Sequence, residues 1–309
     1  MNHDGPRTPR TTFDTHTHLH FPALAPLEQL LSRAREAGVK YILTAGVDLR
    51  TSQRAVEIAE AYPGVYAAVG IHPGNLAQGY QNALAENIDA LKGIALSSEK
   101  VVAIGEIGLD RHVLSEVLSR GDKNPEDVQS GQNPSISPKA ANEQVFALQK
   151  AYFKAQFKLA VTLQKSIIIH NREAAEDLLN ILSDVWDASC RDRVVLHCCE
   201  ARQELLDYAI AHDVFIGIDG DVTYSRKKQD FVKRVPLDRL VLETDSPFLT
   251  PEPIKRERSI NEPSNLVVID RAVQQLRAET TEEAATQESG AFFTNQVTEN
   301  ALKLFQMST

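Results

Sequence analysis

The sequence predicts an α/β fold of the TIM (β/α)8 barrel type, forming a single domain over residues 1–309. Three observations support this prediction. Eight short, β-branched apolar runs recur along the chain, segments with apolar residues at helical spacing separate them, and the runs are nearly continuous in apolar character. Strands of that kind are buried on both faces, as in a parallel sheet covered by helices. Eight such units in one chain indicate a closed barrel.

The eight strands are expected near Thr12–His16, Tyr41–Ala45, Val65–Ile71, Val101–Ile107, Ser166–His170, Val194–Cys198, Val214–Ile218 and Leu240–Thr244. The spacing of apolar residues predicts helices between them, among others at Leu24–Ala37, Thr51–Ala61, Glu143–Leu163, Ala174–Leu182 and Gln203–His212.

Two stretches interrupt this alternation. Residues 112–142, after the fourth strand, are polar and lack sustained periodicity, so we expect an inserted loop that is either disordered or a lid over the catalytic face. Residues 278–309 are expected to form a helical extension, with a loop or helix extension at Ala278–Gly290 and a final helix near Thr294–Phe305.

Composition describes an ordinary globular protein, with 42% hydrophobic and 24% charged residues. No apolar run is long enough to cross a bilayer, and the first residues lack the apolar core of a signal peptide, so we expect a cytoplasmic protein without a membrane partner. Three cysteines are too few for a disulfide framework. The net charge of -9 argues against broad, sequence-independent nucleic-acid binding, but not against a nucleic-acid enzyme whose metal ions supply positive charge.

Potential metal ligands fall at the carboxyl ends of five different predicted strands. They are His16 and His18, Glu106, His170, His197 and Asp245. In a barrel these ends share one rim, which is where active sites of this fold lie. Four histidines and two carboxylates exceed the needs of one Zn²⁺, and they suit two divalent ions with Glu106 as a candidate bridge. Such ions lower the pKa of a bound water and present hydroxide to a substrate, and Asp245 could accept the water proton.

Six motifs occur in order along most of the chain. They are Asp14-Thr15-His16-Thr17-His18-Leu19, Gly70-Ile71-His72-Pro73, Ala103 to Asp110, Ile169 to Ala174, Glu243 to Pro251 and Asn261-Glu262-Pro263. Together they resemble the TatD-type metal-dependent deoxyribonucleases of the amidohydrolase superfamily.

The resemblance implies a TIM barrel, a site for Mg²⁺, Mn²⁺ or Zn²⁺, and hydrolysis of DNA phosphodiesters, often as a 3′-5′ exonuclease on single strands. Carried over by position, the six residues above are the metal ligands. His72 resembles the family's pocket histidine, Arg111 and Arg172 are candidate phosphate contacts, Asp110 would position Arg111 or a ligand, and Glu243 would support a ligand. No obligate protein partner is expected.

The neighbours of these motifs differ from the family. Arg111-His112 replace a usual tyrosine, Cys198-Cys199-Glu200 replace Phe-Ser-Gly, and the residues before Asn261 also differ. Adjacent residues of a strand cannot both face one site, so we expect Cys198 and Cys199 to pack as small hydrophobes rather than as metal thiolates. Basic residues at Arg226–Lys228, Lys255, Arg256 and Arg258 should lie near the active rim, although the first group could simply face water.

The sequence therefore predicts a two-metal hydrolase that acts on DNA, at single strands or 3′ ends. The same pair of ions would also suit an ester or amide hydrolase, such as a D-aminoacyl-tRNA deacylase or a lactonase. A third possibility is a non-catalytic metal- or nucleic-acid-binding protein. Retention of all six ligand types argues against it, because a protein without activity need not keep a water-activating set.

Overall fold

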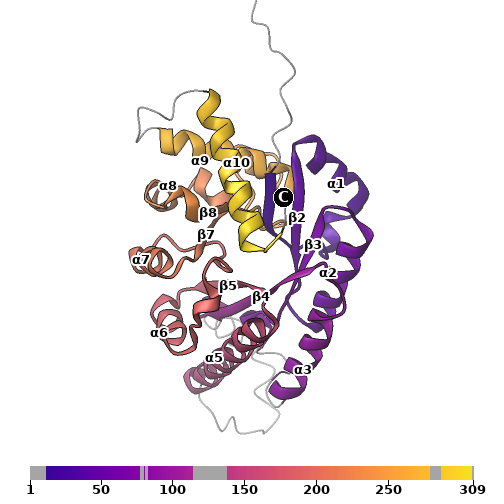
Figure 1. Ribbon diagram of the computed structural model, residues 1–309, viewed down its shortest axis with the longest axis vertical. Coiled ribbons are helices and arrows are strands. Elements are labelled where there is room, and N and C mark those ends of the chain that lie inside the picture. The colour runs from indigo at the N-terminus through magenta and orange to yellow at the C-terminus, as the bar shows by residue number, and fades with distance from the viewer. Residues whose placement is uncertain (1–11, 77–79, 81–82, 114–137, 279–286, 308–309) are drawn as a thin grey trace, which may run out of the picture.

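The computed structural model describes residues 12–76, 80, 83–113, 138–278 and 287–307. One parallel sheet has its eight strands in sequence order, and helices surround it (Figure 1). The strands are β1 Thr12–Thr17, β2 Val39–Ala45, β3 Val65–Val69, β4 Val101–Asp110, β5 Ser166–Arg172, β6 Val194–Leu196, β7 Phe215–Ile218 and β8 Leu240–Leu242. The TIM-barrel prediction is confirmed.

The barrel closes where the chain after β8 meets β1. Asp245 N donates to His16 O at 2.9 Å, and His18 N donates to Ser246 O at 2.7 Å. These two bonds take the place of a regular β8–β1 ladder, and they join two segments that carry expected metal ligands. Closure of the barrel and construction of the site therefore depend on the same backbone contacts.

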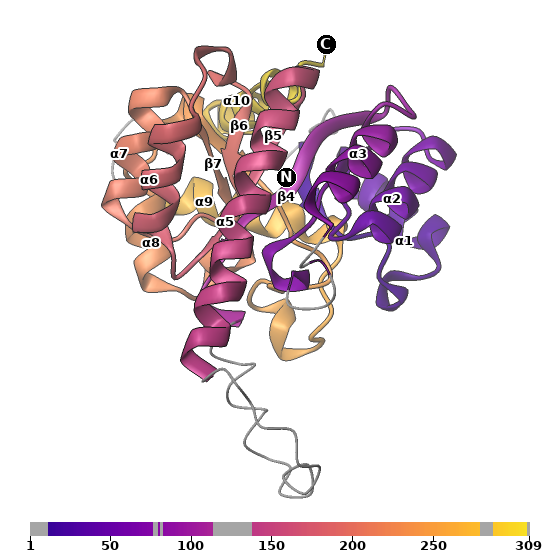
Figure 2. The ribbon, with the colours of Figure 1, turned by 90° about the horizontal axis from the view of Figure 1, so that it is seen from below.

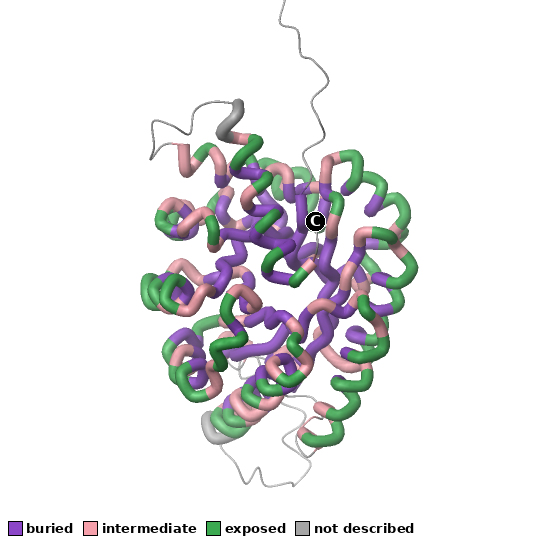
Figure 3. Tube along the Cα trace, in the orientation of Figure 1, coloured by how far each residue is buried: buried purple, intermediate pink, exposed green. Residues whose placement is uncertain are grey.

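The helices form an outer layer. They are α1 Leu27–Glu36, α2 Leu49–Ala61, α3 Leu84–Ala95, α5 Pro138–Leu163, α6 Ala175–Val185, α7 Gln203–His212, α8 Arg226–Val232, α9 Leu266–Ala278 and α10 Gln287–Leu304. In the second view, α1–α3 lie on one side of α5 and α6–α8 on the other (Figure 2). The strands are buried, while the outer faces of the helices are exposed (Figure 3). None of the helices within the described ranges is long and apolar enough to cross a membrane.

Apolar side chains fill the barrel interior at the end opposite the expected ligands. Large residues such as Phe13 and Phe215 interdigitate there with small ones such as Ala68 and Ala103. α10 closes this end, with the Phe305 ring 5.3 Å from the Phe13 ring. The packed plug leaves the carboxyl-end rim as the open face of the barrel.

Several predicted boundaries were wrong. α5 begins at Pro138, so residues 138–142 are helical and do not belong to the inserted loop; residues 114–137 of that prediction lie outside the described residues. α10 begins at Gln287 rather than Thr294. β4 extends to Asp110, whereas β6 stops at Leu196, one residue before His197.

Candidate active site

A pocket of about 640 Å³ opens at the carboxyl ends of the strands. Most of the ligands expected from the sequence line it, together with groups not singled out beforehand. Its polar lining includes His18, His72, Glu106, Asp110, His170, Arg172, His197, Cys198, Asp219, Asp221 and Asp245. His16 lies beneath this lining and is fully buried. The structure therefore brings all six expected ligands to one place.

Local irregularities of the strands direct two of these side chains. The β1–β2 register shifts between Asp14 and Thr17, and the β4–β5 register shifts between Ile104 and Ile107. Such bulges re-aim side chains, and here they bracket His16 and Glu106. Gly108 adopts φ 151°, and a Cβ there would lie 1.9 Å from the His170 carbonyl oxygen. Only glycine allows β4 and β5 to approach this closely beside the site.

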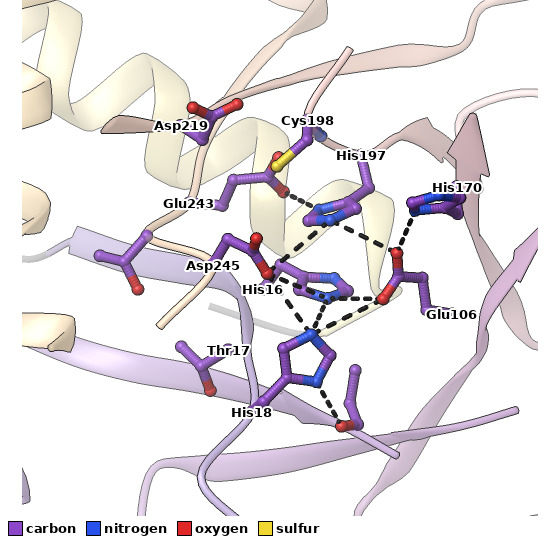
Figure 4. Close-up of polar contacts among 12 residues, drawn as sticks. His16, Thr17, His18, Glu106, His170, His197, Cys198, Asp219, Glu243 and Asp245 are labelled. Atoms are coloured by element: carbon purple, nitrogen blue, oxygen red, sulfur yellow. Dashed lines mark hydrogen bonds and ion pairs between the residues drawn. The ribbon is translucent and has the colours of Figure 1, made fainter. Parts of the chain in front are cut away.

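Four side-chain atoms form a compact donor group, namely Nε2 of His16, Nε2 of His18, Oε2 of Glu106 and Oδ1 of Asp245 (Figure 4). The two histidine nitrogens are 3.3 Å apart, and they lie 3.4 and 3.6 Å from Glu106 Oε2. Asp245 Oδ1 lies 3.9 Å from His16 Nε2 and 3.4 Å from His18 Nε2. Ligands placed about 2.1 Å from a tetrahedral ion would be about 3.4 Å apart. The donor group fits one divalent cation.

The second oxygen of Glu106 faces a different set of histidines. Oε1 lies 3.6 Å from His197 Nε2, 3.6 Å from His72 Nε2 and 2.6 Å from His170 Nδ1. The first two separations suit ligands of one ion. The third is a hydrogen bond, and it is shorter than the edge of about 3.0 Å between neighbouring octahedral ligands at 2.1 Å. His170 would therefore have to move slightly to bind a second cation shared through Glu106.

Further contacts orient the ligand rings. His18 Nδ1 lies 3.0 Å from the Ala45 carbonyl oxygen, which makes Nδ1 the protonated nitrogen and leaves Nε2 free to bind metal. His197 Nδ1 lies 3.1 Å from Glu243 Oε2, so the buried Glu243 supports His197 in the same way. Asp110 Oδ2 lies 3.1 Å from His170 Nε2. Asp110 therefore contacts His170 rather than Arg111, which pairs with Asp177.

The electrostatic environment differs among the histidines of the site. Burial alone would lower the pKa of His197, but Glu243 and Glu106 raise it to about 10. Burial likewise opposes protonation of His170, yet contacts with Asp110 and Glu106 raise its pKa to about 9. At His16 and His72 burial dominates and lowers the pKa, to about 4 for His72. Burial tends to raise the pKa of Glu106, but the surrounding histidines hold it well below its usual range. A buried carboxylate among imidazoles is an environment in which a divalent cation would replace the protons on the histidines.

The candidate substrate residues have different surroundings. His72 lines the pocket, and its Nδ1 accepts a hydrogen bond from Gly74 N at 3.0 Å, which directs Nε2 toward Glu106. Arg172 lines the pocket at the end of β5 and is exposed. Arg111 does not support the expectation of a substrate contact. Its guanidinium lies 3.8 Å from the Phe146 ring and pairs with Asp177 at 2.7 Å, joining β4 to α5 and α6.

The two cysteines behave differently from each other. Cys199 is buried in the core, as expected. Cys198 does not pack in the core as expected, because its side chain lines the pocket, close to donor atoms of His197 and Asp245. That it is no metal thiolate stays a prediction. β6 ends at Leu196 and Cys198 adopts φ 42°, so strand alternation does not govern its direction. Burial raises the pKa of the Cys198 thiol well above its ordinary value, which keeps the thiol protonated.

Sequence reasoning missed an acidic group beside Cys198. Asp219 directly follows β7 and Asp221 lies two residues beyond, both in the pocket lining. Lys228 on α8 neutralises them, with Nζ 3.3 Å from Asp219 Oδ2 and 2.7 Å from the Cys199 carbonyl oxygen. An ionisable residue immediately after an apolar strand was the available signal for Asp219. Lys228 is thus a buried structural cation, while Arg226 and Lys227 are exposed.

The later basic residues are also engaged. Lys255 lies over the Tyr224 ring at 3.9 Å, Arg256 pairs with Glu252 at 2.9 Å, and Arg258 pairs with Glu262 at 3.2 Å. Among the described residues, these three basic side chains are not part of the lining of the pocket that holds the expected metal ligands.

Comparison with known proteins gives consistent matches. Residues 13–306 match the family described as TatD related DNase. The chain is 33% identical to an uncharacterized metal-dependent hydrolase, YabD of Bacillus subtilis, over 96% of this chain and 99% of that protein. It is 30% identical to the 3′-5′ ssDNA/RNA exonuclease TatD of Escherichia coli, over 82% and 85% of the two chains. The crystal structure of YJJV, a TatD homologue from E. coli, superposes with a TM-score of 0.75 and 25% identity, covering 97% of this chain and 100% of that one.

Proposed function

This chain belongs to the TatD related DNase family of metal-dependent hydrolases, and from that membership we propose that it is a 3′-5′ exonuclease that hydrolyses nucleic-acid phosphodiesters. The preferred substrate is a single-stranded 3′ end, as the name of the E. coli relative suggests for that enzyme. DNA is the substrate that we propose first, with RNA as an outcome that the assay below distinguishes.

The observation that carries the proposal is the position of Glu106. Its two carboxylate oxygens face two separate donor groups inside one pocket, with His16, His18 and Asp245 on one side and His170 and His197 on the other. We propose that the pocket holds two divalent cations, Mg²⁺, Mn²⁺ or Zn²⁺, bridged by Glu106. Such a pair activates water and neutralises charge on the attacked group when both ions are bound.

The protein groups have separate roles in this proposal. Asp245 accepts a proton from the attacking water, because its carboxylate belongs to the donor group and also lines the pocket. His72 lies next to the second oxygen of Glu106 and contacts the scissile phosphate. Arg172 reaches a phosphate oxygen from the pocket wall. Glu243 and Asp110 hold the ligand rings in place.

The test compares two substrate classes. Purified protein with Mg²⁺ or Mn²⁺ is incubated with 3′-labelled single-stranded DNA, with an RNA of the same sequence, and with an aminoacyl-tRNA. We expect release of labelled mononucleotides from DNA, and at least 10³-fold less release by Glu106→Ala, which removes the shared ligand. Intact DNA together with a deacylated tRNA would refute the proposal and favour carbonyl hydrolysis.

A further inference from the structure

A second pocket adjoins the one that contains the candidate metal ligands. Its volume is also about 640 Å³, within the range of about 300–1,000 Å³ common for ligand sites. Phe21, Val47 and Asn75 line both pockets. Because three residues are shared, the two pockets form one continuous groove that extends from the metal ligands toward α2.

Aromatic side chains stand at the junction of the two pockets. The rings of Phe21 and Phe248 pack edge to face with centroids 5.4 Å apart, and Phe248 is 46% exposed. The ring centroids of Phe21 and Phe248 lie 5.9 and 6.0 Å from that of His18. Together the two rings give the junction an aromatic surface. Faces of this kind stack on nucleic-acid bases regardless of sequence.

Cationic and hydrogen-bonding groups line the rest of the second pocket. Arg50 is exposed and has no ion-pair partner among the residues that the structure describes. Arg54 pairs only with Glu57, and both side chains are more than half exposed, so a phosphate could displace Glu57 at little cost. The carboxylate of Asp48 is already used as the cap of α2, where it accepts a hydrogen bond from Thr51 N at 2.6 Å.

His20 lines the second pocket beside Phe21. Both of its ring nitrogens are buried, and neither has a hydrogen-bond partner within the described ranges. The ring therefore forms part of the pocket wall without offering it a hydrogen bond. The His20 ring also packs 4.8 Å from the Phe21 ring and holds that ring in place.

We propose that this second pocket binds the nucleotide on the 5′ side of the scissile phosphate, with Phe21 against its base and Arg50 against its phosphate. The inference rests on the exonuclease function proposed above, and we place the terminal nucleotide in the first pocket, where His72 and Arg172 lie. Phosphate would meet an unpaired guanidinium, and a base would meet an aromatic face at the junction. The enzyme would therefore favour a polynucleotide over a substrate that contains only one nucleotide.

The test uses two phosphodiesters of different length. One is the methyl ester of thymidine 5′-monophosphate, which contains one nucleotide and has no aromatic leaving group, and the other is a single-stranded thymidine octamer. The ratio of their kcat/KM values is measured for wild type, Phe21→Ala and Arg50→Gln. We expect each substitution to lower the octamer-to-ester ratio about tenfold, since stacking and phosphate contacts are lost on the longer substrate.

The matched control is Arg35→Gln. Arg35 is an exposed arginine near the carboxyl end of α1, which lies at the end of the barrel opposite the pockets, so the ratio should not change. An unchanged ratio in Phe21→Ala and Arg50→Gln, or an equal fall on both substrates, would overturn the subsite. If wild type cleaves neither substrate, the exonuclease proposal fails. In that case the subsite is tested separately, by measuring the affinity for a labelled octamer through fluorescence anisotropy. Equal affinity in wild type and Arg50→Gln would refute the subsite.

Discussion

Replacing Glu243 with glutamine tests whether this carboxylate controls metal affinity through His197. The substitution removes a negative charge and nearly preserves size. Glu243 is 1% exposed, its Oε2 lies 3.1 Å from His197 Nδ1, and its Oε1 accepts a hydrogen bond from Cys198 N at 2.6 Å. Glutamine can keep the second contact through its amide oxygen. The His197 contact loses its charge, which makes the ring a weaker ligand.

The magnitude follows from the lost contact. The two atoms lie at ion-pair distance without hydrogen-bond geometry, so the lost contact is electrostatic, and for a buried group such a contact contributes about 1.5–3 kcal/mol. At about 1.4 kcal/mol per tenfold change, this corresponds to roughly 10- to 150-fold in metal affinity. Loss of an outer partner of a metal-binding histidine commonly costs about 10- to 100-fold, which agrees.

The assay is a calorimetric titration of chelator-treated protein with Mn²⁺ and with Zn²⁺, at a pH where histidines are neutral in solution. We expect the weaker of the two binding events to lose 10- to 100-fold in affinity in Glu243→Gln. Asp270→Asn is the control, because Asp270 is a buried carboxylate that contacts Thr294 between α9 and α10. Equal metal affinity in wild type and Glu243→Gln would refute this role for Glu243.

Three further predictions concern stability. Burial would raise the pKa of Glu262, but Arg33 and neighbouring groups lower it to about 2. The Arg33–Glu262 pair therefore stabilises the fold at pH values above the ordinary carboxyl pKa of 4.5, and this stabilisation is lost as the pH falls toward 2. Between pH 4.5 and 2, the free energy of unfolding of Arg33→Gln should therefore decrease by about 1–2 kcal/mol less than that of wild type. An equal decrease in the two proteins would contradict this. Lys228→Met leaves Asp219 buried without its cation. In urea titrations it should lower the free energy of unfolding by about 3–5 kcal/mol, whereas substitution of the exposed neighbour, Lys227→Met, should lower it by about 0.5 kcal/mol or less. Phe305→Ala removes the ring that packs on Phe13, and should cost about 3–5 kcal/mol; a loss under 1 kcal/mol would show that α10 does not close the barrel.

The barrel could be predicted because its strands are buried on both faces. Burial of that kind leaves nearly continuous apolar runs, such as Ser166–His170, which a sequence displays directly. The helix α8 was not predicted, since its seven residues include four charged side chains and show no apolar stripe. Its one buried cation, Lys228, becomes recognisable only when α8 packs beside Asp219.

The ligands could be predicted from ionisable residues that end apolar strands, because the carboxyl ends of barrel strands share one rim. The surroundings of those ligands depend on tertiary contacts. Arg111 is adjacent to the rim in sequence, yet Asp177 on α6 and Phe146 on α5 take its guanidinium away from the pocket. Cys198 follows the end of β6, where a positive φ redirects its side chain. Neither outcome is encoded in local spacing.

The most direct test of the account is to follow metal binding and exonuclease activity in the same titration. Chelator-treated protein is titrated with Mn²⁺ while release of nucleotides from a 3′-labelled octamer is recorded, for wild type and for Glu106→Gln. The account predicts that activity rises as the second equivalent binds, and that Glu106→Gln loses both the second equivalent and the activity, because one carboxylate serves both donor groups. Full activity before any metal is added, or two tightly bound equivalents in Glu106→Gln, would contradict it.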